Sequence, residues 1–181
     1  EEDVLITLLG DLHFSSVTIN NQHGKKIIVD GNGHTITTLS GGNAITINQK
    51  SGTVEFKNMT IDHKNLGQIF KANYGITLNL KNMKLIATHD QEKAYLYCLI
   101  NFMGKGTSNL YMEKVEAVLA TTSKGSSAGI IRTGNSDTPK HVNMTLKNCN
   151  FDTTGASGRA GIMVMENCTA DIKISGTTIM T

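Results

Sequence analysis

The stretch Val54-Glu55-Phe56-Lys57-Asn58-Met59-Thr60-Ile61-Asp62 decides the fold, because two later stretches share its pattern. They read Leu78-Asn79-Leu80-Lys81-Asn82-Met83-Lys84-Leu85 and Met144-Thr145-Leu146-Lys147-Asn148-Cys149-Asn150-Phe151-Asp152. The shared pattern is apolar, any residue, apolar, Lys, Asn, apolar, any residue, apolar. A pattern that returns every few tens of residues indicates a structural repeat.

Apolar residues alternate with other residues on both sides of the Lys-Asn pair, and this period of two predicts strands rather than a helix. We expect alternate residues to point into a core and the others to face water. In the first copy the inward set is Val54, Phe56, Met59 and Ile61, and the outward set is Glu55, Lys57 and Thr60. A slip of one residue would bury charge, so the register is strongly specified.

Short apolar runs form a second series between the copies, at residues 44–47, 68–70, 97–100, 129–131 and 161–164. Two series that alternate along the chain indicate two sets of strands with fixed registers, joined by turns of variable length. The arrangement that satisfies this pattern is an all-β solenoid of about six coils, in which each strand pairs in parallel with the matching strands of neighbouring coils. Two antiparallel sheets packed as a sandwich are the alternative.

Asn58, Asn82 and Asn148 interrupt their strands where a coil must bend. Asn tolerates the left-handed backbone conformation, and its amide can bond to the matching Asn one coil away. We therefore expect a ladder of asparagines at a buried corner. Lys114 and Gly176 hold the same position in two other coils, where we expect a local change of turn with the lysine amine reaching solvent.

The Lys-Asn-apolar triplets at 57–59, 81–83 and 147–149, together with Val29-Asp30-Gly31-Asn32-Gly33-His34-Thr35-Ile36, resemble the right-handed parallel β-helix superfamily, the pectate-lyase-like fold. The resemblance covers nearly the whole chain and implies a right-handed parallel β-helix of a secreted or cell-surface bacterial protein. Because this fold carries lyases, hydrolases, adhesins and phage tail fibres, the resemblance does not select an activity.

Composition agrees with one all-β domain spanning residues 1–181, since the chain has 18 Gly, one Pro and no Trp. The 17 basic and 15 acidic residues are scattered, which argues against nucleic acid as a partner. No run approaches the roughly 20 apolar residues of a membrane span. The chain starts at Glu1 and stops within a strand-like run at Thr181, so we expect a fragment or processed part of a longer protein.

No metal or cofactor is expected from the pattern of potential ligands. Cys98, Cys149 and Cys168 lie in apolar contexts without the spacing of a zinc site, and we expect them to pack as small apolar side chains.

Catalytic candidates are weak. Ile61-Asp62-His63 resembles a motif of pectate lyases, whose chemistry, as the resemblance implies, needs calcium-binding carboxylates and an Arg base; the chain has only Arg132 and Arg159. We therefore interpret Asp62 and His63 as a polar turn after a strand.

Pairs of carboxylates are no stronger as candidates. Asp152 shares the repeat position of Asp62, but two coils lie between them, so the two acids would be about 14 Å apart, too far for a hydrolase pair. Asp90 and Glu92 fall in the charged segment 88–93, which we interpret as a solvated loop.

Lys57, Lys81 and Lys147 share one outward position, with Glu113 and Ser175 in the remaining coils. This strip is a candidate site for an anionic glycan, and the alternative is a solvated strand face. The favoured hypothesis is a non-catalytic module of a secreted or cell-surface protein that binds a polysaccharide or a host glycan in adhesion. The alternatives are a polysaccharide lyase or glycoside hydrolase scaffold and a subunit of a fibre; the sequence leaves the oligomeric state open.

Overall fold

The structure, a computed structural model, describes residues 3–20, 24–39, 42–64, 67–89, 98–121, 129–134, 140–155 and 161–181. Within these residues the regular structure consists of strands, in two parallel sheets, and no helix occurs. The candidate carboxylates Asp90 and Glu92 lie outside the described residues.

The first sheet contains 11 strands and forms two sides of each coil. Its strands are β1 (Val4–Thr7), β2 (Leu12–Phe14), β4 (Ile27–Asp30), β5 (Thr35–Thr38), β7 (Thr53–His63), β9 (Thr77–His89), β11 (Gly106–Thr121), β13 (Lys140–Lys147), β14 (Asn150–Asp152), β16 (Cys168–Ser175) and β17 (Ile179–Met180). The second sheet contains six strands. They are β3 (Val17–Ile19), β6 (Ile45–Ile47), β8 (Phe70–Ala72), β10 (Cys98–Phe102), β12 (Gly129–Arg132) and β15 (Ile162–Met163).

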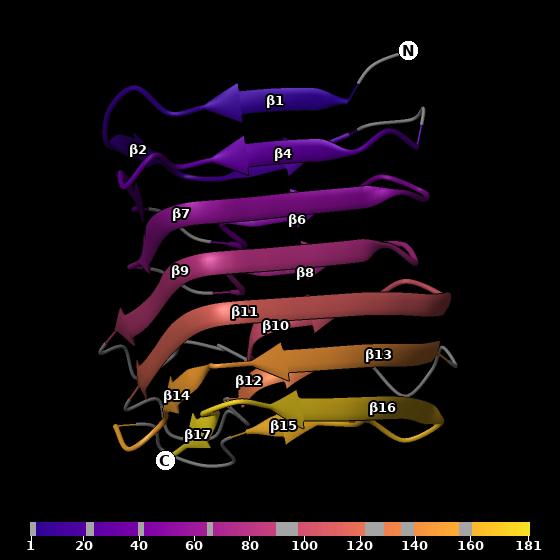
Figure 1. Ribbon diagram of the computed structural model, residues 1–181. Coiled ribbons are helices and arrows are strands. Elements are labelled where there is room, and N and C mark those ends of the chain that lie inside the picture. The colour runs from indigo at the N-terminus through magenta and orange to yellow at the C-terminus, as the bar shows by residue number, and fades with distance from the viewer. Residues whose placement is uncertain are drawn as a thin grey trace.

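The chain winds as a parallel β-solenoid of about five turns. In Figure 1 it crosses the first sheet from right to left, turns back, and returns through the second sheet before entering the next level down, which is a right-handed winding. The all-β class and the parallel solenoid predicted from the repeat are confirmed. The predicted count of about six coils differs slightly from the turns observed.

The repeated stretches pair with one another in register. Lys57 lies opposite Lys81, and Glu113 lies between Lys81 and Lys147 on neighbouring strands. The second series of apolar runs forms the second sheet, as Ile45 pairs with Phe70 and Phe70 with Ile100. Matching sequence positions therefore occupy one column along the solenoid axis.

The core lies between the two sheets and is filled by the inward residues that the alternation predicts. Val54, Phe56, Met59 and Ile61 are all buried. The rings of Phe56 in the first sheet and Phe70 in the second lie 4.9 Å apart, so they join the two walls. Met83 and Met112 are buried in the same way, and Cys98 and Cys149 are buried free thiols, whereas Cys168 is half-buried.

In the five coils from β7 to β17, the first sheet bends at one residue with a left-handed backbone. The φ angles are 55° at Asn58, 51° at Asn82, 54° at Lys114, 53° at Asn148 and 65° at Gly176. The expected change of turn at Lys114 and Gly176 is therefore wrong, because both residues adopt the conformation that Asn adopts elsewhere. β7, β9 and β11 pass through the bend as single strands, whereas the other coils break there into two.

Candidate functional site

The outer surface of the first sheet before the bend carries polar side chains in three columns, which we call the polar face. The residues of the first column are Thr53, Thr77, Asn109, Asn143 and Asp171. Those of the second are Glu55, Asn79, Tyr111, Thr145 and Lys173, and those of the third are Lys57, Lys81, Glu113, Lys147 and Ser175. Alternation sends all of these side chains to the side opposite the core.

The three lysines predicted to bind a glycan each face a carboxylate. Lys57 Nζ lies 3.1 Å from Asp30 Oδ2, and Lys147 Nζ lies 2.9 Å from Glu113 Oε1. Lys81 Nζ lies 3.1 Å from Glu55 Oε2 and so avoids Lys57, its neighbour in the column. The lysine column is therefore a set of ion pairs rather than a strip of uncompensated positive charge.

Glu55 was expected to face water, and this expectation is wrong. The residue is only 5% exposed although it points away from the core, because neighbouring side chains cover it. Its Oε2 lies 3.4 Å from Lys26 Nζ and accepts hydrogen bonds from Lys81 Nζ at 3.1 Å and Asn79 Nδ2 at 3.4 Å. Burial raises the pKa of Glu55, but these donors and the two charges outweigh it and hold the pKa below its ordinary value.

The other carboxylates of this region are also stabilised in their charged form. The hydrogen bond and charge of Lys147 lower the pKa of Glu113. The backbone N–H of Asn32, the amide of Asn58 and the ammonium of Lys57 together lower the pKa of Asp30. A general acid of a hydrolase needs the opposite, a pKa raised by an apolar or anionic environment.

Tyr111 lies in the middle of the polar face with its side chain in contact with solvent. The residue is 46% exposed. It lines two hollows: one of about 310 Å³ that reaches Lys81 and Lys147, and another of about 420 Å³ that reaches Asn143 and Lys173. A phenol ring with polar neighbours on both sides offers an apolar platform and hydrogen-bonding groups together.

A stack of side-chain amides borders Tyr111 on the first column. Asn143 Nδ2 donates to Asn109 Oδ1 at 2.9 Å, and Asn109 Nδ2 donates to Thr77 Oγ1 at 3.2 Å. His141 continues the network, because its Nε2 lies 3.0 Å from Asn143 Oδ1 and its Nδ1 lies 2.7 Å from Thr169 Oγ1. These contacts fix the orientation of the polar groups around Tyr111.

At the bend, two of the three predicted ladder residues are bonded to each other. Asn82 Nδ2 donates to Asn58 Oδ1 at 3.0 Å, and Asn58 Nδ2 donates to Asp30 Oδ1 at 3.1 Å. Lys114 separates this stack from Asn148, whose Oδ1 accepts a hydrogen bond from the Thr177 N–H at 3.1 Å. The corner is not buried as expected, because Asn82 and Asn148 are exposed and Asn58 is half-buried.

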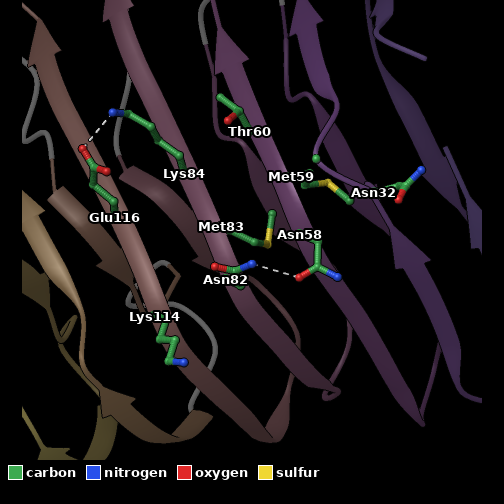
Figure 2. A pocket seen from close by; sticks show the side chains of 10 residues that line it. Asn32, Asn58, Met59, Thr60, Asn82, Met83, Lys84, Lys114 and Glu116 are labelled. Carbon is green, nitrogen blue, oxygen red and sulfur yellow. Dashed lines mark hydrogen bonds and ion pairs between the residues drawn. The ribbon is translucent and has the colours of Figure 1, made fainter. Parts of the chain in front are cut away.

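A groove of about 570 Å³ runs along these bends, and we call it the corner groove. Figure 2 shows residues from several coils around it, with Met59 and Met83 lying between the polar side chains. The polar residues that line it are Asn32, Asn58, Thr60, Asn82, Lys84, Lys114 and Glu116. Lys84 Nζ and Glu116 Oε1 form an ion pair at 2.8 Å on one side of the groove.

Asp62 and His63, the weak catalytic candidates, do not form a turn, because they are the last two residues of β7. Asp62 Oδ2 lies 2.9 Å from Lys64 Nζ. The His63 side chain points the other way and is buried, with its Nδ1 2.6 Å from Thr38 Oγ1 of the preceding coil. Because neighbouring residues of a strand point to opposite faces, the two groups cannot act on one ligand.

Asp152 shares a column with Asp62, with Ile86 and Val118 between them, as the repeat predicts.

Among the described residues no group of His, Cys, Asp and Glu side chains is arranged to hold a metal ion. The same part of the chain contains no helix able to cross a membrane. Burial raises the pKa of the Cys98 and Cys149 thiols, which disfavours the reactive thiolate form.

Sequence reasoning missed Tyr111 and the Asn109–Asn143 stack. The signal was present, because both positions stand at fixed offsets before the lysine column: Tyr111 two residues before Glu113, and Asn109 four residues before it. Aligning the coils on the third column would have shown one aromatic residue among polar ones.

Comparisons with protein-family models, curated proteins and solved structures find no match to this chain.

Proposed function

We propose that this chain is a non-catalytic carbohydrate-binding module and that the polar face binds a glycan. The observation that carries the proposal is the exposed ring of Tyr111 between two hollows lined by amide, hydroxyl and charged groups. Sugar rings have an apolar face of C–H groups and a rim of hydroxyls. An aromatic ring can pack against the first, and fixed amides and ions can bind the second.

The spacing of the columns supports a polymeric ligand. Neighbouring strands of a sheet lie about 4.7–4.9 Å apart, which is similar to the length of one sugar residue in an extended chain. A glycan along the solenoid axis would meet one side chain of the second column per sugar, in the order Asn79, Tyr111, Thr145. The fixed amides of Asn109 and Asn143 would lie beside it at the same spacing.

Binding is favoured over catalysis by the state of the carboxylates on this face. Glu55 and Glu113 are each paired with a lysine, and the pKa of each is lowered. Ionised, paired carboxylates provide hydrogen-bond acceptors for hydroxyl groups but no proton for a leaving group. We further propose, on the resemblance of the repeat to pectate-lyase-like proteins, that the module belongs to a secreted or cell-surface protein.

The test is a glycan-binding screen followed by calorimetric titration of the best ligand. Replacing Tyr111→Ala should weaken binding at least tenfold, because the platform is removed, while thermal unfolding stays nearly unchanged. Tyr74→Ala is the matched control: Tyr74 is 38% exposed but lies in the turn between β8 and β9, outside the polar face. Equal binding by the Tyr111 variant, or release of reducing ends or unsaturated products, would overturn the proposal.

Assembly through the ends of the stack is a second candidate function, favoured by the inward residues of the outermost strands. Val4 and Ile6 of β1, and Ile172 and Ile174 of β16, continue the core columns but are exposed. Sedimentation velocity over a range of concentrations tests this option. A stable oligomer supports it, and a monomer at all concentrations argues against it.

A further inference from the structure

The corner groove lies on the opposite side of the lysine column from the Tyr111 hollows, and one of its residues has an unexpected backbone. Lys114 has a φ angle of 54°, in the left-handed region. The equivalent residues of other coils are Asn58, Asn82, Asn148 and Gly176, which are the residue types that adopt this conformation most readily. A long side chain kept at such a position is typical of a ligand-binding site.

Two lysines line the groove, and Lys114 is the one without a salt bridge among the described residues, although its charge also acts on the neighbouring Glu113. Lys84 is paired with Glu116 at 2.8 Å, and the neighbouring Glu113 is paired with Lys147 at 2.9 Å. Lys114 makes no ion pair with the residues that the structure describes. Figure 2 shows its side chain extending away from the Lys84–Glu116 pair.

The asparagine stack also ends at this position. Asn82 uses its Nδ2 to reach Asn58, so its Oδ1 is the last acceptor of the stack. The register places Lys114 next to Asn82, since the flanking pairs are Lys81 with Glu113 and Met83 with Val115. A cation and an amide acceptor therefore stand side by side at the edge of a groove of about 570 Å³.

We propose that the corner groove binds the anionic group of an acidic glycan through Lys114, with Asn82 accepting a hydrogen bond from a neighbouring hydroxyl. The ligand group is a carboxylate or a sulfate ester, both of which a lysine ammonium binds as a point charge. This inference rests on the proposed glycan binding and names the class of glycan. Tyr111 and Lys114 lie three residues apart on β11, on either side of the third column.

The experiment uses three tetrasaccharides with the same backbone and linkage: cellotetraose, its C6-oxidised glucuronate form and its 6-sulfated form. Calorimetric titration gives Kd for the wild type and for Lys114→Asn, which removes the charge but keeps a residue suited to the left-handed backbone. We expect threefold to fivefold weaker binding of the acidic ligand by the variant, the size of one exposed ionic contact, and no change for cellotetraose. Lys50→Asn, which removes an exposed lysine elsewhere, is the control for net charge.

The three ligands distinguish a carboxylate from a sulfate, and the two variants distinguish the corner inference from the proposed glycan binding at Tyr111. Loss of affinity for the glucuronate form alone assigns a carboxylate, and loss for the sulfated form alone assigns a sulfate. If Tyr111→Ala abolishes binding while Lys114→Asn changes no Kd, the corner inference is overturned and the glycan face stands. If Lys114→Asn weakens acidic ligands while Tyr111→Ala has no effect, the proposed function falls. Absence of binding in all arms overturns both.

Discussion

The inner and outer surfaces of the first sheet differ in how much their residues vary from coil to coil, although they share the same strands. The inner column Val54, Leu78, Leu110 and Met144 is uniformly apolar and fully buried. The outer column one residue further along reads Glu55, Asn79, Tyr111 and Thr145, with a different chemical group at each level. The inner surface specifies the register, and the register then places each outer side chain at a fixed height along the axis.

The largest difference between the two surfaces should appear when a side chain is shortened. Leu80 is fully buried and lies between Phe56 and Met112 on the neighbouring strands. We expect Leu80→Ala to lower the free energy of unfolding by about 2–5 kcal/mol, because it removes apolar contacts and leaves a cavity. Urea unfolding followed by circular dichroism measures this loss.

The control for this prediction lies on the outer surface. Thr145→Val keeps the shape and the β-branched character of the side chain, so its effect on stability should stay within about 0.5 kcal/mol. If the two variants lost comparable free energy of unfolding, the inner surface would not be the one that stabilises the fold, and the comparison would fail.

The fold could be predicted because the inner surface repeats. The alternation around Lys57-Asn58 and its return at Lys81-Asn82 and Lys147-Asn148 give both the inward residues and the spacing between coils. The corner was harder to predict. A repeated Asn indicated a left-handed bend, but the sequence contains no information on whether the corner faces the core or solvent, and the structure leaves Asn82 and Asn148 exposed.

Glu55 is an exception to the difference between the two surfaces, since it belongs to the outer surface but is buried by its neighbours. We expect Glu55→Gln to lower the free energy of unfolding by about 1–2 kcal/mol at pH 7, because two ammonium groups lose their shared anion. The native pKa of Glu55 lies below the ordinary value of 4.5. The wild-type advantage is therefore complete above pH 4.5 and decreases as the pH falls through the native pKa.

Urea unfolding at pH 7 and pH 3 measures both effects. Glu116→Gln is the matched control: the Glu116 carboxylate is paired with Lys84 at 2.8 Å, but its side chain is 45% exposed, so the variant should lose less than about 0.5 kcal/mol. Equal losses of unfolding free energy for the two variants, or a Glu55 effect that does not change with pH, would show that the burial of Glu55 contributes nothing to stability.

The pairing of outer side chains explains why the site was less predictable than the fold. Column positions predicted that Lys57 and Lys81 are neighbours, and they are. They did not predict that Lys81 turns to Glu55 or that Lys26, from the segment before β4, reaches the same carboxylate. Such contacts depend on side-chain length and direction across three coils, which a linear repeat does not record.

The smallest effect should come from completing the asparagine stack. We expect Lys114→Asn to raise the free energy of unfolding by about 0.5–1 kcal/mol, because Asn is better suited than Lys to a φ of 54°. The register also places the new amide where it could donate to Asn82 Oδ1. Thermal and urea unfolding of the variant beside the wild type measure the gain.

Two further variants separate the backbone contribution from that of the amide. Lys114→Gly relieves the left-handed conformation without adding a hydrogen bond, and Lys114→Ala removes the charge without relieving the backbone. The expected order of stability is Asn, then Gly, then the wild type, with Ala at or below it. If Asn is no more stable than the wild type, the left-handed lysine costs nothing, and its position gives no reason to expect a ligand in the corner groove. If the predicted order is found together with weaker binding of acidic glycans, Lys114 lowers the free energy of unfolding but strengthens ligand binding, as expected for a residue of a binding site on the outer surface.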